Sequence, residues 1–136
     1  MEKVYLKPCP EAVEMYPNNH GDQCEVAFIH HYTGELRKVS PTPYWVAADY
    51  EDIQIKSLRL RVDGWDIDDY LRKSAAERYA YVIIDMSAAY IMSPAEFREF
   101  IVKFAKRKEG SKKEPVLRTT SEGQLMIQWF EKNVNR

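Results

Sequence analysis

The segment from Tyr79 to Phe104 constrains the fold more than any other part of the chain. It opens with the apolar run Tyr79-Ala-Tyr-Val-Ile-Ile84, in which β-branched and aromatic side chains follow one another without polar alternation. Such a run predicts a strand that is buried on both faces. Ser93 and Glu96 then have the spacing of a helical capping box, with Pro94 at the favoured first helical position. The segment therefore predicts a sheet with an amphipathic helix packed on it.

The C-terminal part of the chain, 58–136, predicts strands and helices in alternation. Besides the central strand and helix, the pattern contains a strand at Leu58–Val62, a helix that Asp66 caps and that ends near Arg78, a strand at Pro115–Thr119 and a last helix from Ser121. Right-handed crossovers between these elements would give a βαβαβα unit with a parallel core sheet.

The N-terminal part, 1–57, predicts a β-rich region. The segments expected as strands are Val4–Leu6, Glu25–Tyr32, Leu36–Val39, Tyr44–Ala48 and Ile53–Ile55. A turn around Gly34 would join the second and third of these strands as an antiparallel hairpin. The expected fold class is α/β, or α+β overall. We expect residues 1–136 to form one domain, with a mixed sheet, this N-terminal hairpin and three packed helices.

Composition indicates one soluble domain and gives no global attraction to a charged partner. The 136 residues are 45% apolar and carry a formal net charge of −1. No apolar run approaches the ~18 residues of a membrane-spanning helix, and the first residues lack the layout of a signal peptide. We expect a cytoplasmic protein without a membrane partner.

The charges are unevenly distributed along the chain. Residues 49–69 contain seven acidic and three basic side chains, whereas 98–118 contain eight basic and three acidic ones. Two solvated faces are the interpretation that the pattern favours. The alternative is a bipolar molecule that meets an oppositely charged partner, or a second copy of itself head to tail.

Residues 58–134 resemble the STAS domain of anti-sigma-factor antagonists. The resemblance depends on Asp85-Met-Ser-Ala-Ala-Tyr-Ile-Met-Ser93, followed by Phe97 and the apolar helix. In that family the strand ends in Asp-hydrophobic-Ser, and a turn with a phosphorylatable serine and a glycine begins the helix. Here the serine position falls on Pro94 and the glycine position on Glu96. The resemblance implies a non-enzymatic protein-binding module in which the phosphorylation switch is lost, unless Ser93 substitutes.

Five potential metal ligands lie in the first quarter of the chain. They are Cys9, His20, Cys24, His30 and His31. Their spacing matches no zinc ribbon or finger, and no Cys-x₂-Cys pair is present. His30 and His31 would point to opposite faces of a strand, so at most one could join Cys24. Ordinary strand and loop residues are the favoured interpretation, and no cofactor is expected.

Two short patterns raise the question of catalysis. Glu51-Asp-Ile-Gln54-Ile-Lys56 resembles the carboxylate-or-amide-x-Lys edge of metal-dependent nucleases, but no upstream Asp on a suitable strand is assignable, and a charged strand start is favoured. Asp85 follows a buried strand, where open α/β sheets place their ligands, although a turn aspartate has the same pattern. Because no second catalytic group pairs with Asp85, no catalytic residue is assigned.

Aromatic residues favour protein docking as the function. Nine tyrosines and three tryptophans exceed ordinary usage, and both types are common interface residues. The candidate partner-binding residues are Tyr44, Trp45, Tyr50, Trp65, Asp85 and Ser93. We expect a small non-catalytic regulatory protein, such as an accessory or inhibitor protein of a bacterium, phage or mobile element. It would bind another protein or itself as a homo-oligomer.

Nucleic-acid binding is the alternative function. The helix and connector over 103–113 concentrate positive charge, which would contact phosphates in a salt-dependent way. The candidate residues are Lys103, Lys106, Arg107, Lys108, Lys112 and Lys113. No RNA-recognition or helix-turn-helix signature accompanies them.

Overall fold

The computed structural model describes residues 1–57, 67–104, 106–107, 115–116 and 121–135. The elements are β1 (Glu2–Tyr5), α1 (Pro10–Met15), α2 (His20–Thr33), β2 (Ile53–Lys56), α3 (Ile67–Lys73), β3 (Arg78–Val82), β4 (Ala88–Met92), α4 (Pro94–Phe104), β5 (Lys106–Arg107), β6 (Pro115–Val116) and α5 (Ser121–Val134). In this described part of the chain, no helix is long and apolar enough to cross a membrane.

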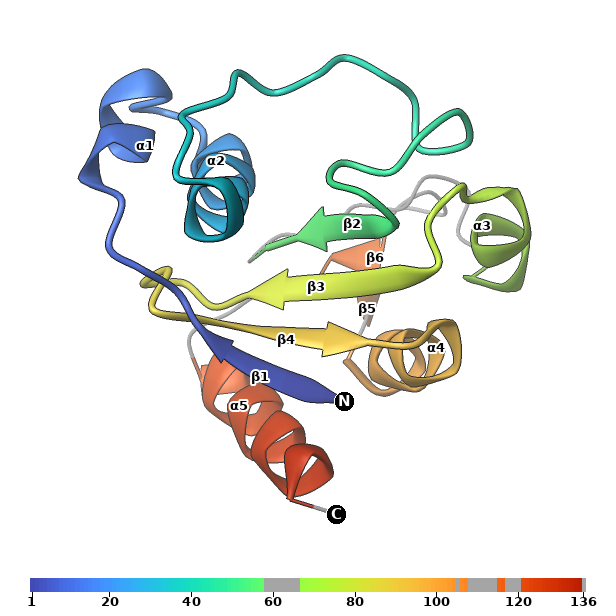
Figure 1. The fold of residues 1–136 in the computed structure, drawn as a ribbon. Coiled ribbons are helices and arrows are strands. Elements are labelled where there is room, and N and C mark those ends of the chain that lie inside the picture. Colours follow the sequence, from blue (N-terminus) through green and yellow to red (C-terminus); the bar gives the residue numbers. More distant parts are fainter. Residues whose placement is uncertain (58–66, 105, 108–114, 117–120, 136) are drawn as a thin grey trace.

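Four strands form a mixed sheet in the order β1-β4-β3-β2, which confirms the α+β class (Figure 1). Strand β2 runs parallel to β3, whereas β3–β4 and β4–β1 are antiparallel. The sequence correctly predicted that β3 is buried on both faces. Tyr79 and Tyr81 pack on one side, and Ala80 and Val82 pack on the other.

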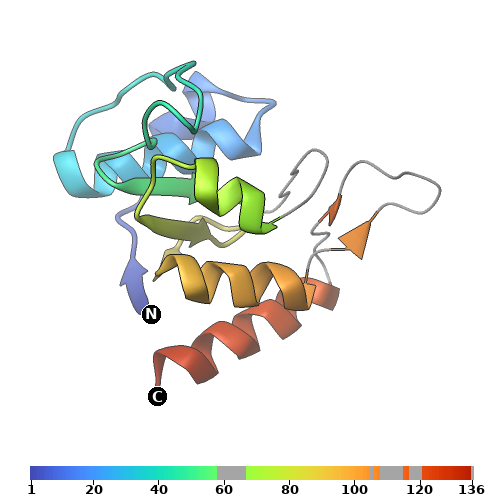
Figure 2. The same ribbon diagram turned by 90° about the vertical axis from the view of Figure 1, so that its right-hand side faces the viewer.

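Helices cover both faces of this sheet. Helices α1 and α2 lie on one face, while α3, α4 and α5 lie on the other (Figures 1 and 2). On the α2 side, Phe28 and Ile55 belong to one apolar cluster with the small residues of β3. On the other side, Phe97, Phe100 and Phe130 of α4 and α5 pack against the tyrosines of the sheet. Four of the nine tyrosines, Tyr70, Tyr79, Tyr81 and Tyr90, are core residues.

The two C-terminal helices form where the sequence predicts them. In the capping box of α4, Ser93 Oγ accepts from the Glu96 N–H at 3.2 Å and Glu96 Oε1 accepts from the Ser93 N–H at 2.9 Å. Phe97, Phe100 and Ile101 are fully buried, as their helical spacing requires. Helix α5 likewise buries Met126 and Phe130.

The predicted N-terminal hairpin is wrong, because Glu25–Tyr32 lies inside the helix α2. This helix is buried on two sides, which removes the single apolar stripe by which a surface helix is recognised. Phe28 and Ile29 pack against the sheet, while Val26 and Ala27 pack against the α1 region. The resulting run of apolar residues resembles a buried strand in sequence.

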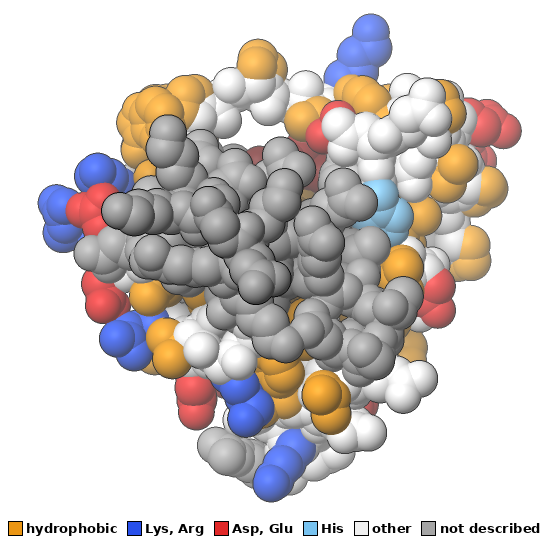
Figure 3. All heavy atoms as spheres, turned by 180° about the vertical axis from the view of Figure 1, so that it is seen from behind, with side chains coloured by type: hydrophobic (Ala, Val, Ile, Leu, Met, Phe, Trp, Pro, Cys, Tyr) orange, Lys and Arg blue, Asp and Glu red, His pale blue; other side chains and the backbone are white. Residues whose placement is uncertain are grey.

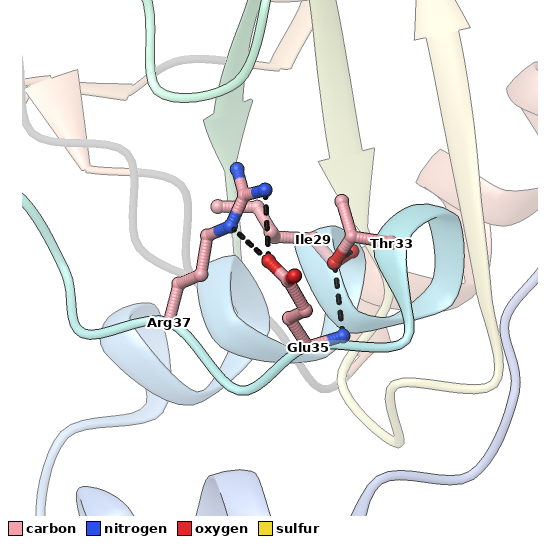
Figure 4. Close-up of polar contacts among 4 residues, drawn as sticks. All are labelled: Ile29, Thr33, Glu35 and Arg37. Carbon is pink, nitrogen blue, oxygen red and sulfur yellow. Dashed lines mark hydrogen bonds and ion pairs between the residues drawn. The ribbon is translucent and has the colours of Figure 1, made fainter.

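Helix α2 ends at Gly34, which adopts a left-handed backbone with φ 72°. Figure 4 shows this end: Thr33 Oγ1 donates to the Ile29 carbonyl at 2.9 Å and accepts from the Glu35 N–H at 3.1 Å. Arg37 and Glu35 then form an ion pair at 3.0 Å. The turn predicted around Gly34 is present, but it terminates a helix.

Replacing Gly34 with alanine is expected to lower the free energy of unfolding by about 1–2 kcal/mol, because only glycine adopts this left-handed conformation without strain. A Cβ at this position would meet no atom within 4 Å, so backbone strain is the only cost. Urea unfolding measures the loss. An unchanged midpoint would show that the backbone relaxes to an unstrained conformation.

Further expectations differ from the structure. Leu36–Val39 is irregular, and residues 44–46 form a turn instead of a strand. The described residues form five helices, whereas three were predicted. The chain after Asp85 returns directly as β4, so β3 is followed by an antiparallel strand and not by a helical crossover. Strand β6 pairs with β5 in a two-stranded sheet separate from the four-stranded one. The strand predicted at Leu58–Val62 lies outside the described residues.

The acidic and basic stretches of the sequence meet within the molecule. Arg98 of α4 donates to both carboxylate oxygens of Asp68 in α3, at 2.7 and 3.3 Å. On the face shown in Figure 3, basic and acidic side chains also alternate along the left-hand rim. These contacts support the interpretation that the charged stretches form solvent-exposed faces of α3 and α4, on which opposite charges pair with each other.

Candidate metal centre

Two carboxylates meet beside the edge strand β2. Glu25 is half-buried in α2, and Asp49 immediately precedes the turn into β2. Two backbone hydrogen bonds between Tyr50 and Ile53, of 2.8 and 3.1 Å, close this turn. Asp49 Oδ2 accepts from the Ile55 N–H at 2.9 Å, and the Asp49 carboxylate lies close enough to that of Glu25 to raise its pKa. Local backbone geometry thus brings Asp49 to the helix that carries Glu25.

The proximity of these two acids is electrostatically unfavourable. Burial and the neighbouring charge of Asp49 raise the pKa of Glu25 to about 8. At neutral pH Glu25 therefore tends to keep its proton, because a buried carboxyl group beside another carboxylate resists ionisation. A cation bound between them would remove this penalty.

Lys56 interacts electrostatically through its ammonium with both carboxylates. It is half-buried at the end of β2, and burial lowers the pKa of its ammonium while Asp49 and Glu25 oppose that effect. Its Nζ lies 5.3 Å from the centroid of the Tyr70 ring, a cation–π distance. The aromatic ring of α3 therefore holds the amine near the carboxylates.

Gln54 adds an unsatisfied oxygen on the same face of β2. It lies two residues before Lys56, so both side chains leave the strand on one side. Only 8% of Gln54 is exposed, and its Oε1 accepts no hydrogen bond from the described residues. The buried hydroxyl of Tyr70 is also without a hydrogen-bond partner there. Buried polar atoms are normally satisfied by protein groups or by ordered water.

This donor set suits a hard divalent cation. Among the described residues, no group of three or more His, Cys, Asp or Glu side chains is arranged to hold a metal ion. Mg²⁺ does not need such a group, because it keeps several waters and uses one or two carboxylates together with substrate phosphates. Glu25 and Asp49 supply carboxylate oxygens of this kind.

The potential zinc ligands are dispersed. His20 and Cys24 touch, with 3.6 Å between Nδ1 and Sγ, but His20 Nε2 lies 2.8 Å from the Ile84 carbonyl oxygen. Burial raises the pKa of Cys24 to about 12, which keeps it a thiol. Cys9 belongs to a separate apolar cluster, and His31 accepts from the Lys7 N–H.

The aromatic docking candidates have different environments. Trp45 is 59% exposed, whereas Tyr44 is half-buried and stacks on Tyr70 at 4.6 Å between ring centroids. Tyr50 packs against Phe28 near α2. Trp65 lies outside the described residues.

Asp85 and Ser93 lie far from this aromatic group along β3 and β4. Asp85 accepts from the N–H and hydroxyl of Ser87 at 3.0 and 2.6 Å, and these hydrogen bonds lower its pKa. It lines a cavity of about 420 Å³ beside Cys9. Ser93 lines another cavity, of about 290 Å³. The five candidate docking residues that the structure describes are thus distributed over separate places.

The basic segment is described only in part. Lys103 is exposed near the end of α4, with Nζ 5.7 Å from the centroid of the Phe104 ring. Lys106 and Arg107 are the two residues of strand β5. Lys108, Lys112 and Lys113 lie outside the described residues.

Sequence reasoning missed two members of the candidate metal centre. The amide-x-Lys pattern of Gln54 and Lys56 was the available signal for this site, but that pattern predicts its acidic partner on an upstream strand. Asp49 lies in a turn only five residues before Gln54, and Glu25 lies on a helix that was predicted as a strand.

Comparison with protein-family models, with curated proteins and with solved structures found no match to this chain. The resemblance to STAS domains stays a prediction. The residues on which it depends, Asp85 to Ser93, form a tight turn and the strand β4.

Proposed function

We propose that this protein is a metal-dependent phosphodiesterase that acts on nucleic acid. The observation that carries the proposal is the proximity of Glu25, Asp49 and Lys56 beside the edge strand β2. Paired carboxylates and a lysine are groups that a divalent cation and a phosphodiester require. The nuclease-like spacing of Gln54 and Lys56 in the sequence supports the same function.

Each residue has a distinct role in this proposal. Asp49 and Glu25 would hold Mg²⁺, which would polarise the phosphate and lower the pKa of a bound water. Lys56 donates hydrogen bonds to the phosphoryl oxygens as negative charge develops on them. Water adds across the ester: its oxygen bonds to phosphorus, the bond to the sugar oxygen breaks, and that oxygen takes up a proton.

Protein docking, the function favoured by the sequence, stays a second prediction. The exposed Trp45 supports it, but the five candidate residues within the described part of the chain do not form one surface. The basic segment that suggested nucleic-acid binding remains compatible with the proposed substrate. The metal-dependent reaction is the function that the site geometry favours.

The proposal is tested with the variant Glu25→Gln, which keeps the shape of the side chain and removes one ligand carboxylate. We expect the protein to cleave DNA or RNA with Mg²⁺ or Mn²⁺ and to be inactive in EDTA. The variant is expected to lose about 10-fold or more in metal affinity, since even outer-shell changes cost this much. Isothermal titration with Mn²⁺ and the Mg²⁺-induced rise in Tm measure that loss.

Glu14→Gln is the matched control, because Glu14 is an exposed carboxylate on the neighbouring helix α1. It should retain the metal affinity and activity of the unaltered protein. If neither Mg²⁺ nor Mn²⁺ raises the Tm of the unaltered protein, the metal centre is refuted. Equal losses in both variants would refute the role of Glu25.

A further inference from the structure

A row of aromatic rings leads from solvent to the candidate metal centre. Trp45, 59% exposed, meets Tyr44 edge-on, with 5.1 Å between centroids and an interplanar angle of 85°. Tyr44 stacks on Tyr70 at 4.6 Å and 21°. Tyr70 in turn contacts the ammonium of Lys56, as described above. Each ring of the row thus contacts the next, and the last contacts the site.

The loop that carries Trp45 is held in place by backbone hydrogen bonds. The N–H groups of Val46 and Ala47 both donate to the Pro43 carbonyl, at 2.9 and 3.2 Å. The Ala75 N–H donates to the Tyr44 carbonyl at 2.9 Å, which ties this loop to the segment after α3. The exposed ring is therefore presented by an ordered turn, so that little conformational entropy is lost when a flat ligand stacks on it.

We infer that Trp45 stacks a nucleobase and that the substrate of the candidate metal centre is single-stranded nucleic acid. The inference rests on the proposed function, because that function places a phosphodiester beside Lys56. Proteins that bind single strands stack the bases on aromatic rings and hold the phosphates with basic groups. Trp45 would supply such a ring, and Lys56, at the other end of the row, would supply such a basic group. In a duplex the faces of the bases are already stacked on one another, so a ring cannot cover them without unstacking a base.

The test measures fluorescence anisotropy of a labelled oligothymidylate with Ca²⁺ in place of Mg²⁺. The unaltered protein is expected to bind this single strand more tightly than the corresponding duplex. Trp45→Ala is expected to weaken single-strand binding by about 5- to 150-fold, the effect of losing one stacked base. Trp45→Phe should restore most of the affinity, because it restores a stacking face.

Val46→Ala is the matched control, since Val46 is 63% exposed on the same turn and has no ring. It should bind the single strand as the unaltered protein does. Single-strand affinity that is equal in Trp45→Ala and Val46→Ala would overturn the inference, and so would a duplex that competes as well as the single strand. A Trp45→Ala variant that loses only the binding of a protein partner would overturn it in favour of docking.

Failure of the inference and failure of the proposed function give different results. Glu25→Gln should bind the oligothymidylate in the absence of metal as the unaltered protein does while cleaving it more slowly. Undiminished cleavage by Glu25→Gln contradicts the metal centre alone. Undiminished single-strand binding by Trp45→Ala, together with slow cleavage by Glu25→Gln, contradicts the stacking alone.

Discussion

Replacing Lys56 with methionine is expected to lower kcat for oligonucleotide hydrolysis by about 100- to 1,000-fold, the usual effect of removing one donor to a developing negative charge. Methionine keeps the length of the chain and its contact with the Tyr70 ring, but it donates no hydrogen bond. KM should change far less, because the interaction strengthens mainly in the transition state. Steady-state kinetics with saturating Mg²⁺ measures both constants.

Lys73→Met is the control for this variant. Lys73 is exposed on α3 and pairs with Asp69 at the surface, so its loss should alter kcat less than about threefold, in keeping with the small energies of exposed ion pairs. A Lys56→Met protein with the kcat of the control would remove Lys56 from the reaction. A rise in KM with an unchanged kcat would assign it to substrate binding instead.

Replacing Phe130 with alanine is expected to lower the free energy of unfolding by about 3–5 kcal/mol, the range for large aromatic truncations in a core. Phe130 is fully buried and stacks on Tyr90 at 4.4 Å and 6°, while its ring also lies 4.8 Å from that of Phe100. It therefore joins α5 both to the sheet and to α4. Equilibrium urea unfolding followed by circular dichroism measures the loss.

Leu125→Ala is the control in the same helix, because Leu125 is 56% exposed. Surface substitutions usually change stability by less than about 0.5 kcal/mol. Comparable losses in the two variants would show that α5 contributes through its own helical stability. A loss confined to Phe130→Ala would confirm that docking onto the sheet stabilises this end of the chain.

Elements with complete local signals were predictable. Helix α4 has its cap at Ser93, its proline at the first turn and one apolar stripe, so that its start and buried face both follow from short-range rules. The strand β3 followed from an apolar run that only a doubly covered sheet can bury. In both cases the local preference and the tertiary packing agree.

Two elements were mispredicted because packing decided their form. Helix α2 lies between α1 and the sheet, so its apolar residues surround the helix instead of marking one side. The return strand β4 depends on a tight turn in which Asp85 accepts from Ser87, a feature that Asp85 shares with many non-hairpin turns. Neither pattern is distinctive over a few residues.

The sequence by itself determined the α+β class, the buried strand β3, the helices α4 and α5, and the pairing of Gln54 with Lys56 on one face of a strand. Each follows from spacings of two to four residues, which set backbone hydrogen bonding and the side on which a chain buries itself. Only the tertiary structure brought Glu25 and Asp49 together, because they are far apart in sequence and come from a helix and a turn. Long-range proximity of like charges depends on how α2 packs on β2, and no local rule encodes that.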